Sequence, residues 1–267
     1  MNELVSPLRV TGIGSLPHRD PAAAVDFVET WSTEIPFWAQ LPQRTADENM
    51  LTQMLMPLRD LLRPRRWGQL EIAPGALSEF RRRLRDERAE LEKDTAAGFF
   101  AFESALQDGR FAEALALKGQ LTGPITLARC LFYQGRAVVT LPDLPEELTE
   151  YVRRLGLWQA ARLNAFGKPV WLFIDEPALA LGPTPPDFFA GLKQLVATLR
   201  AAGIYTGIHC CATPAPVVLC GLQPDLISFD ANAGLELFLA SRPVREYIAA
   251  GGALGFGMIP TVKCLPA

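Results

Sequence analysis

Reactive side chains are scarce in this sequence, and several classes of protein are excluded by what it lacks. The 267 residues include two histidines and five cysteines, and an odd number of cysteines indicates thiols or metal ligands rather than a disulfide framework. The net charge of −3 gives no electrostatic reason to bind nucleic acid or an anionic membrane. The start of the chain, Met1–Leu4, lacks the basic and apolar parts of a signal peptide. A cytoplasmic location is therefore expected.

Long apolar runs are also absent. No uninterrupted apolar stretch reaches the roughly 18 residues of a membrane-spanning helix. Short apolar runs instead alternate with longer amphipathic segments, which is typical of β/α units around a parallel sheet. Strands are expected at residues 8–14, 35–40, 114–120, 170–174, 204–211, 225–230 and 253–259. Helices are expected at residues 21–31, 47–62, 76–107, 145–166, 186–202, 216–221 and 243–250.

This pattern predicts one domain over residues 1–267, a TIM (β/α)₈-type barrel that lacks its last strand. Residues 63–108 form a helical insertion after the second strand. Gln69–Ile72 is the alternative source of an eighth strand, but we favour a chain that stops before that strand. Because an open sheet edge exposes apolar surface and unpaired backbone groups, we expect a homodimer or a further C-terminal segment.

The strongest functional signal is the run Ile204–Cys211, which ends in His209, Cys210 and Cys211. Side chains alternate along a strand, so His209 and Cys211 point to one face and Cys210 to the other. Imidazole and thiolate are typical zinc ligands. The strand that ends at Asp230 follows in the sequence and could add an oxygen ligand. Asp230 fits equally well as a helix cap before Ala231 and Asn232.

Other polar residues also lie where predicted strands end, and in a parallel barrel these ends form the functional face. They are Ser15, His18, Gln40, Lys118, Thr122, Asp175, Glu176 and the segment 261–264. Asp175 and Glu176 follow five bulky apolar residues, which favours a functional carboxylate over a simple turn residue by about two to one. A lone loop histidine such as His18 is more often just exposed to solvent.

Five segments resemble cobalamin-independent methionine synthase, in the order found in its C-terminal catalytic barrel. They are Gly12–Pro17, Gly119–Thr126, Ile174–Leu179, the His209–Cys211 pair and Asp225–Asp230. The resemblance extends to the superfamily that includes uroporphyrinogen decarboxylase and covers nearly the whole chain except residues 63–108.

The resemblance implies zinc-dependent transfer of a methyl group from 5-methyltetrahydrofolate to the thiol of homocysteine, a step of methionine biosynthesis. It implies that His209 and Cys211 bind zinc and that Asp230 replaces a glutamate ligand. Asp175 would bind the amino group of the amino-acid substrate and Ser15 its carboxylate region. Gln40 stands near the position of a substrate-binding glutamate, and Thr122 completes the expected substrate site.

The chain also departs from the family. Cys264 falls where the family has a proton-transfer histidine, and a further cysteine ligand is missing. The fourth zinc ligand is therefore the substrate, Cys264 or a residue outside this sequence. Two alternatives stay open: a thiol methyltransferase that takes its methyl group from a corrinoid protein, and a barrel without activity that binds zinc or an amino acid. A decarboxylase function is the weaker interpretation, because decarboxylation does not require the His-Cys pair.

Overall fold

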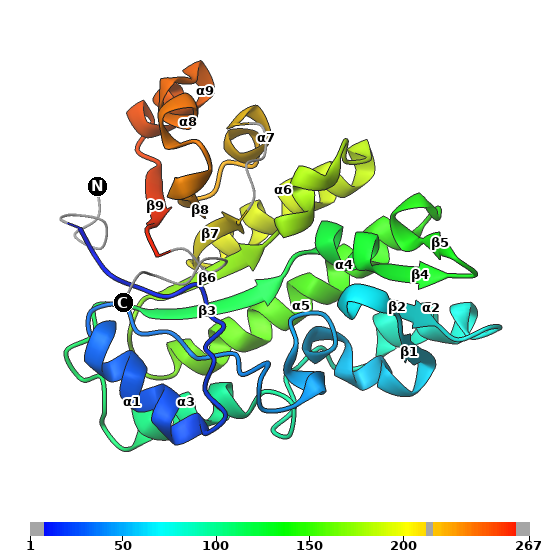
Figure 1. The fold of residues 1–267 in the computed structure, drawn as a ribbon, viewed down its shortest axis with the longest axis horizontal. Helices are drawn as coiled ribbons and strands as arrows, with labels where there is room; N and C mark the ends of the chain where they lie inside the picture. Colours follow the sequence, from blue (N-terminus) through cyan, green and yellow to red (C-terminus); the bar gives the residue numbers. More distant parts are fainter. Residues whose placement is uncertain (1–7, 212–215, 260–267) are drawn as a thin grey trace.

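The computed structural model describes residues 8–211 and 216–259, and its centre is a sheet of five parallel strands (Figure 1). The strands lie side by side in the order β3-β6-β7-β8-β9. Their bounds are β3 Leu117–Thr122, β6 Val170–Asp175, β7 Tyr205–Cys210, β8 Leu226–Asp230 and β9 Ala253–Gly257. The predicted alternation of helices with a parallel sheet is confirmed.

Two segments predicted as strands form only isolated bridges, one to the sheet and one between the two segments. Phe37 forms a parallel bridge with Lys118 of β3, and Ser15 forms one with Gln40. Pro36 has no N–H to donate to a ladder. Gly12 lets the chain approach closely, because a Cβ on it would lie 2.2 Å from Cζ of Phe37. Continuous strands at residues 8–14 and 35–40 are therefore wrong predictions.

The sheet is open. Within residues 8–211 and 216–259, the only strand that pairs with β9 is β8, and the bridge at Ser15 is the last contact on the opposite side. The segments nevertheless follow one another across the sheet in the order of the sequence, as the predicted barrel requires. The structure thus shows a mixed α/β fold whose sheet does not close in the described part of the chain.

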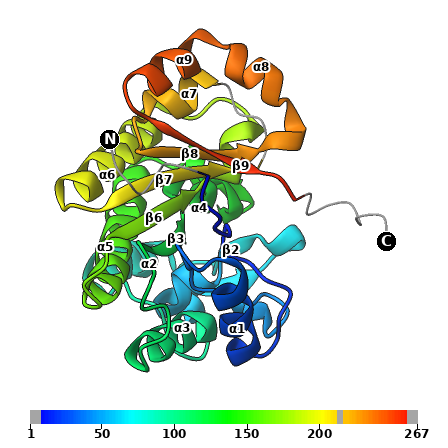
Figure 2. The ribbon, with the colours of Figure 1, turned by 90° about the vertical axis from the view of Figure 1, so that its left-hand side faces the viewer.

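Helices cover one face of the sheet. They are α1 Pro21–Trp31, α2 Leu77–Asp86, α3 Ala97–Gln107, α4 Pro124–Cys130, α5 Leu144–Asn164, α6 Pro186–Ala201, α7 Pro216–Gly221, α8 Leu235–Ala240 and α9 Arg242–Ala249. Helix α5 packs on β3 and β6, and α6 packs on β7. Figure 2 shows α7, α8 and α9 beyond β8 and β9, far from α1 and α3. None of the described helices is long and apolar enough to cross a membrane.

The helix-covered face carries the main hydrophobic core. Leu121, Leu172, Ile174 and Ile208 point from the strands into this core, where they meet side chains of α5 and α6 such as Leu199. The alternate residues of the same strands point to the other face, where the apolar cluster is small and consists of Ala116, Trp171 and Phe173 with Tyr205 and Leu226. That second face therefore leaves room for polar side chains.

The predicted helix at residues 76–107 is interrupted between α2 and α3. Arg154 of α5 donates hydrogen bonds to the carbonyls of Leu84 and Glu87 and so satisfies the C-terminal end of α2. Ala89 and Leu91 of the connection are buried in the core. Tertiary contacts that the local pattern does not reveal thus end the helix early.

The predicted helix at residues 47–62 is replaced by 3₁₀ segments at Ala46–Glu48 and Gln53–Leu61. Between them, Oδ1 of Asn49 accepts hydrogen bonds from the backbone N–H groups of Leu51 and Thr52, both at 3.0 Å. Such bonds compete with the backbone pairing of an α-helix.

A small second sheet lies next to this region, in the order β1-β2-β4-β5. Its strands are β1 Leu62–Pro64, β2 Leu70–Ile72, β4 Leu131–Tyr133 and β5 Arg136–Ala137. The alternative strand at Gln69–Ile72 is thus a real strand, β2, but it belongs to this sheet and does not extend the main one. The insertion at residues 63–108 is therefore α-helical in α2 and α3, with a short 3₁₀ turn at Arg66–Gly68.

The contact between α3 and the segment at residues 35–40 gives a test of the fold. A Cβ on Gly98 would lie 1.7 Å from the carbonyl oxygen of Ala39. We expect Gly98→Ala to lower the free energy of unfolding by about 1–3 kcal/mol through overpacking, measured by urea denaturation. Gly221→Ala is the matched control, because its Cβ would meet only Cζ of Phe189, at 3.4 Å. Equal stability of the two variants would contradict the described packing of α3.

Candidate functional site

Polar side chains form a row across the carboxyl ends of four neighbouring strands. Thr122 of β3 is paired with Asp175 of β6, Asp175 with His209 of β7, and His209 with Ser228 of β8. Residues paired in this way project from the same face of a parallel sheet. The structure therefore brings the predicted residues Thr122, Asp175 and His209 together on the face that the helices leave uncovered.

His209 is held in its neutral form. Its side chain is buried, and Nδ1 lies 3.1 Å from Oγ of Ser228. Desolvation and the charge of Lys118 lower the pKa of His209 to about 4, while Asp230 acts in the opposite sense. Since a metal binds the neutral imidazole, His209 is in the protonation state that a ligand needs at neutral pH.

The two cysteines after His209 diverge, as strand alternation predicts. Cys210 is buried in the core between the sheet and the helices, whereas Cys211 is exposed. Desolvation raises the pKa of the Cys211 thiol, and the charges of Asp175 and Asp230 raise it further, although a backbone hydrogen bond opposes them. At neutral pH Cys211 thus needs a nearby cation to become a thiolate.

Asp230 acts as a cap in this structure. Its Oδ1 accepts hydrogen bonds from the backbone N–H and the side-chain amide of Asn232, both at 2.9 Å. Among residues 8–211 and 216–259, no three His, Cys, Asp or Glu side chains are grouped closely enough to hold a metal ion. His209, Cys211 and Asp230 therefore offer the right donor atoms but are not assembled into one site. Cys264 lies outside the described residues.

Lys118 is a central residue of this face, although the sequence marks it only as one of several polar residues near predicted strand ends. Its fully buried Nζ donates hydrogen bonds to the carbonyl of Ile13 at 2.6 Å and to Oε1 of Gln120 at 3.1 Å. It also lies 4.5 Å from the centre of the Phe173 ring. Desolvation lowers the pKa of Lys118, against the effect of the negative charge of Asp175. A lysine inside a strand that is otherwise uncharged was the available signal.

Asp175 has an unused acceptor on this face. Its Oδ1 is buried and has no hydrogen-bond partner among the described residues. Desolvation raises the pKa of Asp175, and the charge of Lys118 opposes this shift. A buried carboxylate oxygen without a partner is costly, so a ligand that donates a hydrogen bond or carries a positive charge would be favoured here.

Glu176 has a structural role. Its buried carboxylate accepts hydrogen bonds from the backbone N–H groups of Ile125 (2.9 Å) and Thr126 (2.7 Å) and from Oγ1 of Thr126 (2.6 Å), at the start of α4. Gly123 makes room for it, because a Cβ there would lie 2.2 Å from Oε1 of Glu176. The segments Gly119–Thr126 and Ile174–Leu179 are thus joined by one carboxylate.

Ser15 and Gln40 are also brought together. Oγ of Ser15 donates to Oε1 of Gln40 at 2.9 Å, and the backbones of the two segments exchange hydrogen bonds between Leu16 and Gln40 and between Gln40 and Gly14. The substrate-binding role of Gln40 stays a prediction, and in this arrangement its buried amide orients Ser15. Thr122 is engaged as well, since its Oγ1 donates to the carbonyl of Met50 at 2.6 Å.

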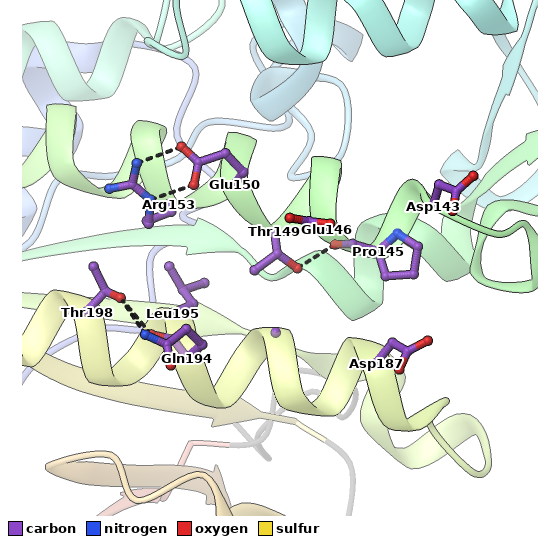
Figure 3. A pocket seen from close by; sticks show the side chains of 11 residues that line it. Asp143, Pro145, Glu146, Thr149, Glu150, Arg153, Asp187, Gln194, Leu195 and Thr198 are labelled. Carbon is purple, nitrogen blue, oxygen red and sulfur yellow. Dashed lines mark hydrogen bonds and ion pairs between the residues drawn. The ribbon is translucent and has the colours of Figure 1, made fainter.

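A cavity of the molecule lies elsewhere. It measures about 620 Å³ and lies between α5 and α6 on the outer side of the molecule (Figure 3). Its polar lining includes the ion pair of Glu150 with Arg153, and its other charged side chains, Asp143, Glu146 and Asp187, are acidic. None of the predicted site residues lines it, so we place the candidate site on the sheet face.

No protein-family model and no curated protein matches this chain. The geometry of the described residues therefore carries the functional argument.

The cap formed by Glu176 can be tested by stability measurements. In Glu176→Gln an NH₂ group replaces one acceptor and faces a backbone N–H, so we expect a loss of about 1–3 kcal/mol in the free energy of unfolding. Thr126→Val removes the hydroxyl that donates to Glu176 and also accepts from the backbone N–H of Ala178 at 3.3 Å, and should cost about 1–2 kcal/mol. Thr140→Val, at an exposed 3₁₀ turn, is the control. Urea denaturation at pH 7.5 measures the stability of all three variants. An unchanged free energy of unfolding in Glu176→Gln would contradict the capping role of Glu176.

Proposed function

We propose that this chain is a zinc-dependent methyltransferase that moves a methyl group to a small thiol such as homocysteine. The observation that carries the proposal is the row of Thr122, Asp175, His209 and Ser228 at the carboxyl ends of the strands, with Cys211 directly after it. In barrels this end holds the active site. The order of the strand segments supports a barrel of the (β/α)₈ type, and we place the enzyme in the cytoplasm.

Zinc would be held by His209, Cys211 and Asp230, an N, S and O donor set that this metal accepts. When bound, it would make the substrate thiol a thiolate at neutral pH, which is the form that attacks a methyl group. His209 is already neutral, and Cys211 requires a cation to ionise. Because Asp230 also caps Asn232, binding requires that its carboxylate turn away from that amide.

The residues next to the metal ligands would bind and orient the substrate. Asp175 offers an unpartnered carboxylate oxygen to the ammonium group of an amino-acid thiol. Lys118 lies on the same face of the sheet, and its positive charge counteracts the upward shift of the Asp175 pKa. Burial still raises the pKa of Asp175 above its usual range, and a bound ammonium group would add to the effect of Lys118 and favour the ionised carboxylate. The methyl donor would be a folate or a corrinoid protein.

Metal content tests the proposed site. We expect the purified protein to contain about one equivalent of zinc, and His209→Asn and Cys211→Ser to lose it, because a structural or catalytic zinc needs most of its protein ligands. Cys220→Ser, in α7 on the far side of the sheet, is the matched control and should keep the metal. Inductively coupled plasma mass spectrometry measures the content.

Less than about half an equivalent of zinc in the parent protein would contradict the proposal, since neutral-pH zinc sites bind tightly. Retention by Cys211→Ser would show that the ligand assignment is wrong. Zinc-loaded protein is then incubated with homocysteine and either methyltetrahydrofolate or a methyl-corrinoid protein, and methionine is detected by mass spectrometry. Zinc without methyl transfer would favour the inactive zinc-binding barrel.

A further inference from the structure

A series of hydrogen bonds between buried amides, here called the amide chain, ends at the exposed hydroxyl of Ser15. Oγ of Ser15 donates to Oε1 of Gln40 at 2.9 Å, Nε2 of Gln40 donates to Oε1 of Gln53 at 2.7 Å, and Nε2 of Gln53 donates to the carbonyl of Thr95 at 2.5 Å. Gln40 and Gln53 are only 6% and 1% exposed, while Ser15 is exposed. Water therefore has little access to the amide chain.

The direction of every bond in the amide chain follows from its inner end. The backbone carbonyl of Thr95 can only accept, so it fixes the NH₂ of Gln53 toward itself and Oε1 of Gln53 toward Gln40. Gln40 must then donate to Gln53, which leaves its own oxygen facing Ser15. The hydroxyl proton of Ser15 is therefore committed to Gln40.

A hydroxyl has one proton and two lone pairs. With its proton committed, Ser15 can offer only lone pairs to a ligand. We propose that Ser15 is a specificity-determining residue that accepts a hydrogen bond from an ammonium, amide N–H or hydroxyl group of the ligand and discriminates against a carboxylate. The identity of the ligand as an amino-acid thiol rests on the proposed function. The hydrogen-bonding polarity of Ser15 is independent of that function.

The backbone around Ser15 is held as well, which keeps its Cβ beside the amide of Gln40. Leu16 N–H donates to the carbonyl of Gln40 and Gln40 N–H to the carbonyl of Gly14, both at 2.9 Å. Gly14 also packs closely on Gln120, where a Cβ would lie 2.7 Å from the side-chain amide carbon. This assignment reverses the role that the resemblance implied for Ser15, the carboxylate region of the substrate.

Two small thioethers that differ only at the polar end provide the test, 2-(methylthio)ethylamine and 3-(methylthio)propionate. Neither presents a thiol that zinc could ionise, and because an amine or a carboxylate can also bind zinc, each measurement is repeated with a chelator present. Dissociation constants are measured by NMR for the parent protein, Ser15→Ala and the control Ser241→Ala, whose hydroxyl bonds locally to Phe238 between α8 and α9.

We expect Ser15→Ala to weaken binding of the amine about five-fold, as for loss of one hydrogen bond, and to leave binding of the carboxylate unchanged. Gln40→Leu frees the Ser15 hydroxyl to donate and should strengthen carboxylate binding several-fold. Ser15→Ala does not touch the buried amides, so its result stands even if Gln40→Leu fails to fold.

Three outcomes overturn the proposal: weaker carboxylate binding in Ser15→Ala, no change for either compound in that variant, or no binding of either compound to the parent protein. A protein without zinc that still shows the selective loss of amine binding would disprove the proposed methyl transfer and leave the role of Ser15 standing. If the protein is zinc-loaded and active but Ser15→Ala binds both compounds as the parent does, the proposed function stands and the role of Ser15 is disproved.

Discussion

The register of the parallel strands is the constraint on which the site depends. Neighbouring strands β3, β6, β7 and β8 pair so that alternate residues share a face. This register places Asp175 beside His209, although the two residues are far apart in the sequence. The same alternation buries Cys210 among the helices and leaves Cys211 at the end of the strand. A shift of one residue in any strand would exchange the core and the polar row.

The sequence predicts the periodic elements well because their signal is local. The five central strands follow short apolar runs, and helices α1, α5, α6 and α7 end close to their predicted limits. Some failures have a local cause, since Asn49 and Pro36 interrupt predicted elements from within. In other places the deciding group lies far away in the chain. Arg154 ends α2 from the middle of α5, and the backbone carbonyl of Ala39 packs against Gly98.

The candidate site was predictable in its members and less so in their roles. Strand ends identified Asp175, His209 and Ser15, since a polar residue after an apolar run is visible in the sequence. The division between Asp175 and Glu176 was not visible, because it depends on the N–H groups of α4 that only the fold brings to Glu176. Gln40 likewise looks like a ligand residue until its buried amide is seen to link Ser15 with Gln53.

The amides behind Ser15 also separate two kinds of recognition on one face. Glutamine and serine side chains do not ionise in the range in which proteins are stable, so the polarity at Ser15 is the same in acid and in base. Carboxylates and amines such as Asp175 and Lys118 change charge with their surroundings. Orientation of a bound molecule can thus stay constant while its attraction to the site varies with the acidity of the medium.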